Sequence, residues 1–215
     1  MKKWLGGAFL LLVLHTPFAS AAEIPHHPTV AVMDFGEHKG MATSDIIMDN
    51  TGATASDYII EALVESGYYE VITKDLVSER LAAEGLKTVG IIDPDTAKRI
   101  GEILGVRYLI YGNLNDVSGS GLKFLIISNG ANVNTVKAHI IARMMDVETG
   151  EIVMAAKGEG NSKSALVQAG TDHLGFITVG SKRISQVSVH NSLKKAAYDM
   201  VNKLTRRLKR LSGEI

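Results

Sequence analysis

The sequence contains no cysteine, and this single absence excludes several classes of protein. Without thiols there is no disulfide framework, no thiolate nucleophile and no cysteine-ligated metal site. The absence also excludes the lipid-acceptor cysteine that anchors bacterial-type lipoproteins. We therefore expect the fold to depend on its apolar core alone.

An excess of charge of either sign is also missing. Lys plus Arg and Asp plus Glu number 23 each in 215 residues, so the formal net charge is +0. This balance argues against a strongly basic nucleic-acid binder, and we expect no nucleic-acid partner. The chain is 46% hydrophobic and 21% charged, which is typical of a globular protein with a sizeable core. Its length predicts one domain with long excursions.

The N-terminal residues have the three regions of a secretory signal peptide. Lys2 and Lys3 precede an apolar run over residues 5–14, which is too short to span a bilayer as a stable helix. Ala19-Ser20-Ala21 has the small-residue pattern of a cleavage site. We predict a signal peptide over residues 1–21 and export to the periplasmic space, with a retained membrane anchor as the alternative.

The first half of the mature chain alternates strand patterns with helix patterns. Strands are predicted over residues 29–35, 68–73 and 106–114. Helices are predicted from a capping box at Thr54 and Asp57 to Gly67, over residues 74–85, and from Asp93 to Gly105. The last of these has the strongest start signal, because Asp93 is a good N-cap and Pro94 suits the first helical position.

The second half begins with a β-hairpin and ends with a helix. Residues 135–147 and 151–160 flank Glu148-Thr149-Gly150, a turn in which we expect Gly150 to have a positive φ. Apolar residues at helical spacing then run from Leu193 to Leu211. The order of elements predicts an α+β domain over residues 29–211, with a mixed β-sheet flanked by helices.

The usual signatures of catalysis and cofactor binding fail when they are compared residue by residue. The stretch "GEGNSKS" (158–164) resembles a phosphate-binding loop, but Ser162 stands where that motif needs glycine. Asp34 ends the first strand, where ligands often bind, although a turn or cap role is the commoner alternative. No catalytic, cofactor-binding or metal-ligating residue is therefore predicted, and no cofactor.

The histidines do not form a metal site in the sequence, because none has a second ligand at the spacing that metal sites use. The mature chain has His26, His27, His38, His139, His173 and His190.

The C-terminal helix carries a basic cluster around its apolar stripe. Such a helix can lie on an anionic surface, or its cations can complement the helix dipole and face solvent. We favour the solvated face. The cluster comprises Lys203, Arg206, Arg207, Lys209 and Arg210.

The order of these segments resembles the CsgG/HfaB family of curli and holdfast secretion components. The resemblance is carried by "VAVMDF", "GATASDYIIEALVESGYYEVITKDLVSERLAAEGL", "AKRIGEILGVRYLIYGNL", "ARMMDVETGEIVMAAKGEG" and "VQAG". It covers about residues 29–205 of this chain.

The resemblance implies a non-enzymatic assembly or secretion component in the cell envelope. It implies self-association, contacts with envelope or exported proteins, and association with the outer membrane through β-hairpin extensions at about 114–136 and 155–188. The chain is also similar to LpoB-type activators of cell-wall synthases. A soluble periplasmic module that binds protein partners is therefore the alternative.

Overall fold

The structure is a computed structural model that describes residues 27–37, 50–86, 89–126, 129–167, 177–179, 182–184 and 186–214. The predicted signal peptide lies outside these residues, as do His26, His38 and His173. The cleavage site therefore stays a prediction.

A six-stranded mixed sheet forms the centre of the protein. Strand β1 (Thr29–Val32) pairs in parallel with β3 (Glu70–Val71) and β4 (Tyr108–Ile126), and β2 (Gly36–Glu37) also pairs in parallel with β4. Strands β5 (Asn129–Asp146) and β6 (Glu151–Val167) continue the sheet in antiparallel fashion, so its order is β3-β1-β4-β5-β6. The short strands β7 (Ile177–Val179) and β8 (Lys182–Ile184) pair only with each other. The predicted α+β fold with a mixed sheet is confirmed.

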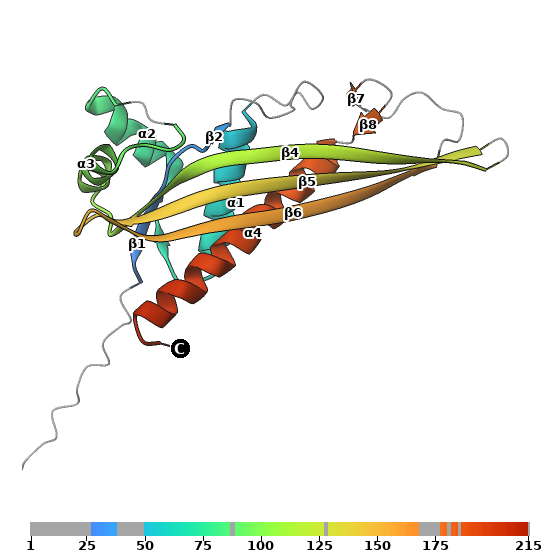
Figure 1. Ribbon diagram of the computed structural model, residues 1–215. Helices are drawn as coiled ribbons and strands as arrows, with labels where there is room; N and C mark the ends of the chain where they lie inside the picture. The colour runs from blue at the N-terminus through green and yellow to red at the C-terminus, as the bar shows by residue number, and fades with distance from the viewer. Residues whose placement is uncertain are drawn as a thin grey trace, which may run out of the picture.

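Helices cover the two faces of the sheet unequally. Helices α1 (Thr51–Glu65) and α4 (Gln186–Leu211) pack on one face, where they form the larger apolar core with β1, β4, β5 and β6. Helices α2 (Lys74–Ala83) and α3 (Pro94–Leu104) form a smaller core on the other face, close to the β5–β6 turn. Strands β4, β5 and β6 extend well past α2 and α3, and their far ends also pass beyond α4 (Figure 1).

Strands β4 and β5 pair from the body out to Ile126 and Asn129, which covers the first predicted extension as far as the structure describes it. The second predicted extension does not form one continuous element among the described residues. Residues up to Val167 belong to β6 and pair with β5, whereas the β7–β8 pair is a separate small sheet.

The start of helix α1 corrects the sequence prediction. The helix begins at Thr51, after Asn50 in the left-handed region (φ 61°), and not with a capping box at Thr54. Tertiary contacts fix this start, because Gly52 lies against the Phe35 carbonyl with no room for a Cβ atom, and its N–H donates to Glu37 Oε1 at 3.1 Å. Asp57 instead accepts a hydrogen bond from Lys74 at 3.0 Å.

The β5–β6 turn forms where the sequence predicts it. Gly150 has a φ of 75°, and its N–H donates to the Asp146 carbonyl at 2.8 Å. The buried Asp146 carboxylate accepts from the N–H groups of Glu148 and Thr149, and Arg107 pairs with it at 2.7 Å. The turn is therefore held by backbone conformation and by one buried carboxylate.

We predict that Gly150→Val lowers the free energy of unfolding by on the order of 1 kcal/mol or more, because a β-branched residue is strained at positive φ. Gly150→Asn is the matched control, since asparagine tolerates this region and the loss should be smaller. Urea denaturation of the three proteins measures the difference. Equal stability of all three would contradict the strain at this turn.

Candidate partner-binding surface

Helix α4 is amphipathic, and its apolar side is buried as the sequence predicts. Of the residues in the predicted stripe, Leu211 is the exception, and it is 63% exposed at the end of the helix. Small residues share the buried side, since Ser188, Ser192 and Ala196 follow one another at intervals of four residues and are almost fully buried. The other buried apolar residues are Val189, Leu193, Ala197, Met200, Val201, Leu204 and Leu208.

Two glycines of β6 let α4 approach the sheet closely. A Cβ atom on Gly158 would overlap the Ala196 carbonyl oxygen and lie 2.7 Å from Cβ of Met200. One on Gly160 would overlap the Ser192 carbonyl oxygen and lie 2.6 Å from the Ala196 nitrogen. The stretch that resembles a phosphate-binding loop is thus a strand whose glycines serve helix packing.

A row of polar side chains on α4 covers the outer edge of β6, which is the edge strand of the sheet. Lys195 donates to the Asn161 carbonyl at 3.0 Å, and Asp199 accepts from the Glu159 N–H at 3.0 Å. Lys203 donates to the Lys157 carbonyl at 2.8 Å. Because the three helix residues are four apart and the strand residues are two apart, the helix satisfies alternate edge positions as a neighbouring strand would.

The charge on Asp199 contributes to this attachment. Burial raises the pKa of Asp199, but the hydrogen bonds from Lys203 and from the Glu159 N–H outweigh it, so the pKa lies below its ordinary value. Lys203 Nζ lies 2.7 Å from Asp199 Oδ2, one helical turn away. The carboxylate therefore joins the helix to the strand edge and holds the lysine that makes the next contact.

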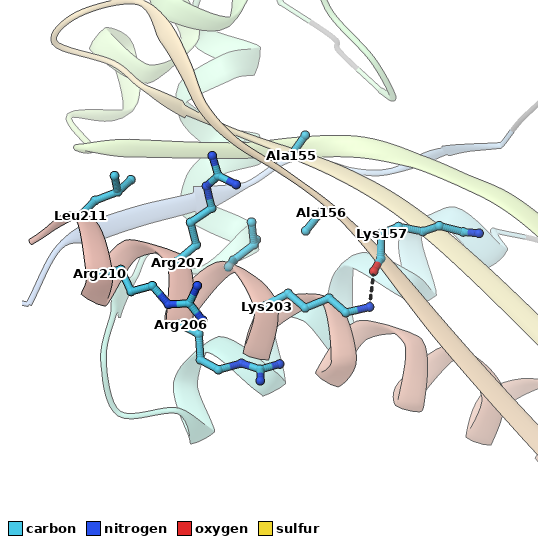
Figure 2. A pocket seen from close by; sticks show the side chains of 9 residues that line it. Ala155, Ala156, Lys157, Lys203, Arg206, Arg207, Arg210 and Leu211 are labelled. Carbon is cyan, nitrogen blue, oxygen red and sulfur yellow. Dashed lines mark hydrogen bonds between the residues drawn. The ribbon is translucent and has the colours of Figure 1, made fainter. Parts of the chain in front are cut away.

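Beyond Lys203 the helix and the strand enclose a groove of about 660 Å³. Figure 2 shows the groove between the last turns of α4 and the first half of β6, with the Arg207 side chain reaching toward the strand near Ala155. Five of its lining residues are basic, and the remainder are Ala155, Ala156, Leu204 and Leu211. The basic residues are Lys157, Lys203, Arg206, Arg207 and Arg210.

The cations of the groove differ in how far they are paired. Lys157 lies 2.9 Å from Glu159, and Arg206 donates to the Asn202 carbonyl at 3.2 Å. Among the residues that the structure describes, the guanidinium groups of Arg207 and Arg210 have no ion pair or hydrogen-bond partner. Both are exposed, so the groove presents unpaired positive charge to solvent. The sequence places these arginines on an exposed face but does not indicate that the face borders a strand edge.

Asp34, a candidate ligand-binding residue in the sequence, forms an ion pair in the structure. Lys74 Nζ lies 2.8 Å from Asp34 and 3.0 Å from Asp57. Burial lowers the pKa of Lys74, but the two carboxylates outweigh that effect and raise it. The adjacent cavity of about 390 Å³ is lined mainly by apolar side chains, and among its lining residues only Asp34 and Lys74 are ionisable. The cluster holds the end of β1 to α1 and α2.

The described histidines lie apart from one another. His139 of β5 lies 3.7 Å from Asp116 of β4, and His190 of α4 contacts the Tyr58 hydroxyl at 3.0 Å. His27 contacts the Tyr68 carbonyl at 3.3 Å. Within the described part of the chain, no three histidine, aspartate or glutamate side chains gather as metal ligands would.

The family model for the curli production assembly/transport component CsgG matches residues 17–212. The chain belongs to the CsgG family. This confirms the resemblance seen in the sequence, and the members of this family are proteins of the cell envelope. A search of curated proteins finds no match. Within the described residues, every helix is too short or too polar to cross a membrane.

Several solved structures are similar to the chain at low sequence identity. The LpoB C-terminal domain from Escherichia coli is 16% identical over 65% of this chain and 86% of that one, with a TM-score of 0.43. The PelC dodecamer from Paraburkholderia phytofirmans is 13% identical over 84% and 86%, with a TM-score of 0.36. A putative neuraminyllactose-binding hemagglutinin homolog from Helicobacter pylori is 12% identical over 93% and 95%, with a TM-score of 0.41.

We predict that Gly160→Ala lowers the free energy of unfolding by about 1–3 kcal/mol, because the new methyl group must displace the backbone of α4. Asn161→Ala is the control, since Asn161 is exposed and its carbonyl contact with Lys195 does not depend on the side chain. Chemical denaturation measures both. A Gly160→Ala protein as stable as the Asn161→Ala protein would contradict the close packing.

We predict that Asp199→Asn costs stability at neutral pH and that the difference disappears in acid. A lowered pKa stabilises the folded state above the ordinary carboxyl value of about 3.9, and the gain is lost as the pH falls through the folded value. Urea titrations at neutral pH and below about pH 3 measure this difference. Exposed Glu79, mutated to Gln, is the control. A difference that persists in acid would show that charge is not its source.

Proposed function

We propose that the protein is a non-enzymatic assembly or secretion component of the cell envelope that acts through contacts with other copies of itself and with envelope or exported proteins. The observation that carries the proposal is the long three-stranded extension of the sheet. Strands β4, β5 and β6 have 19, 18 and 17 residues, whereas β1 has four. A sheet that outgrows its helices provides surface for association beyond what the core requires.

The uncovered face of this extension supports a role in association. Beyond α2 and α3, alternate residues of β5 and β6 point away from α4 and are exposed or half-buried. They include Lys137, His139, Lys157, Glu159 and Asn161. Such a face is polar and charged, which suits contact with proteins and leaves the sheet soluble when it is unoccupied.

The burial pattern of residues 155–162 in β6 supports the soluble alternative over direct contact of this segment with lipid. Gly158, Gly160 and Ser162 are buried on the side of β6 that faces α4, and the opposite side chains are polar. Residues 155–162 of the second predicted extension thus belong to the helix-covered body. A soluble periplasmic module that binds protein partners, including an LpoB-like activator of a cell-wall synthase, accordingly remains the second candidate. The domain bounds and membrane contact through the remaining extension residues are part of the proposal.

Fractionation and measurement of the oligomeric state test the proposed function. We expect the full chain, tagged at its C-terminus and produced in a bacterium with an outer membrane, to be recovered from the envelope as an oligomer. Native mass spectrometry in mild detergent gives the number of subunits. A chain that lacks residues 1–21 is the control, and it should stay in the cytoplasm.

Each outcome distinguishes between the candidates. An oligomer in the outer-membrane fraction supports the assembly or secretion component. A monomer confined to the soluble periplasmic fraction supports the partner-binding module instead. Retention of the full chain in the cytoplasm would contradict both.

A further inference from the structure

The outer edge of β6 has a covered part and an open part. Lys195, Asp199 and Lys203 cover the backbone at Asn161, Glu159 and Lys157, as described above. In an antiparallel ladder, residues two apart point their N–H and C=O groups to the same side. Ala155 pairs with Arg143 of β5, two positions before Lys157, so its outward groups continue the same edge.

No side chain of the described residues makes a hydrogen bond to the backbone of Ala155, whereas the three covered positions of the edge each have one. The polar row of α4 has spacing of four residues, so the position after Lys203 in the row is Arg207. Arg207 makes no hydrogen bond to the strand, and the groove begins at this point. The alanine side chains at 155 and 156 leave the edge accessible. A strand edge with free donors and acceptors is a template for another extended chain.

The positive charge on the α4 side of the groove determines which kind of extended chain can bind at the β6 edge. Within the described residues the guanidinium groups of Arg207 and Arg210 are unpaired, and Arg206 donates to the Asn202 carbonyl and interacts electrostatically with Asp199. The carboxylates nearest the groove, Asp199 and Glu159, are already engaged by Lys203 and Lys157. The groove therefore has an excess of positive charge that carboxylates of a ligand can neutralise.

We propose that this groove binds an extended, acidic segment of a protein partner, which adds to the edge of β6 beside Ala155 while its carboxylates pair with Arg207 and Arg210. The inference rests on the proposed function, because it names the kind of partner segment that an assembly component would hold. An open strand edge is a feature that a peptide backbone satisfies and a lipid headgroup does not. Among the groove's lining residues, Leu211 is the only large apolar side chain that is exposed, which is too little to insert into a membrane.

A labelled peptide provides the direct test. The probe is an acetylated decapeptide of alternating Glu and Val, titrated with the full mature chain and followed by fluorescence anisotropy. We expect Arg207→Gln/Arg210→Gln to weaken binding about tenfold, because both arginines are exposed and their two ion pairs together contribute about 1.4 kcal/mol. Lys98→Gln/Arg99→Gln on α3 is the matched control, which removes two basic residues from a helix on the other face of the sheet, outside the lining of the groove, and should leave the affinity unchanged.

A second peptide separates strand addition from simple charge attraction. Methylation of the peptide's backbone nitrogens keeps every carboxylate but removes the donors that an added strand needs. We expect this peptide to bind at least about tenfold more weakly, which corresponds to the loss of one or two backbone hydrogen bonds. Hydrogen exchange should also show that the unmodified peptide protects the amide of Ala155 and that the methylated one does not.

The other outcomes overturn the inference. Equal affinity for both peptides would reduce the groove to a non-specific cationic patch. Failure of the acidic peptide to bind, together with arginine-dependent binding to vesicles of anionic phospholipid, would assign the groove to a membrane surface. Because Arg207 and Arg210 lie outside the extended sheet, the variants should keep the wild-type oligomeric state. Failure of the unmodified, wild-type oligomer to bind the acidic peptide would therefore contradict this inference alone, and not the proposed function.

Discussion

The close approach of α4 to β6 is the contact on which the rest of the structure depends. Gly158 and Gly160 remove two side chains from the sheet, and Ser192 and Ala196 keep the facing side of the helix small. Backbones that approach this closely bring the polar row of α4 within hydrogen-bonding distance of the strand edge. A helix held farther away by larger residues would leave that edge exposed along its whole length. The small residues of β6 and α4 therefore explain both the close helix packing and the hydrogen bonds along the strand edge.

The same contact assigns different roles to the two faces of the extended sheet. With α4 fixed on one face, the alternate side chains of β5 and β6 must lie on the other. Among the described residues of that other face, many side chains are polar or charged, including Lys137, Lys157 and Glu159. The smaller core under α2 and α3 fixes the opposite end, where Arg107 and Asp146 join β4 to the β5–β6 turn.

Features that depend on neighbouring residues in sequence could be predicted, and those that depend on distant ones could not. Asp93 caps α3 and Gly105 ends it in the left-handed region, as the local pattern indicates. The predicted start of α1 was wrong by three residues, because the helix begins where Gly52 packs against the Phe35 carbonyl. No local pattern in the sequence indicates this contact. Strand β4 continues past residue 114 through a polar, glycine-containing stretch that is typical of a loop, because β5 supplies its hydrogen bonds. Two glycines spaced two apart in a strand, with small residues spaced four apart in a later helix, are the signal that would have located the α4–β6 contact.

The strands at the two ends of the sheet order, β3 and β6, differ greatly in length. Strand β3 has two residues, whereas β6 has 17. Past Leu114, however, β4 pairs only with β5 among the described strands, so the three-stranded extension has two long edges for strand pairing, one on β4 and one on β6. Head-to-tail polymerisation through sheet edges needs two such places on each molecule, one to offer and one to accept. The polar row of α4 covers part of the β6 edge, so it shortens one of these two places and opposes the joining of copies into an open-ended fibre.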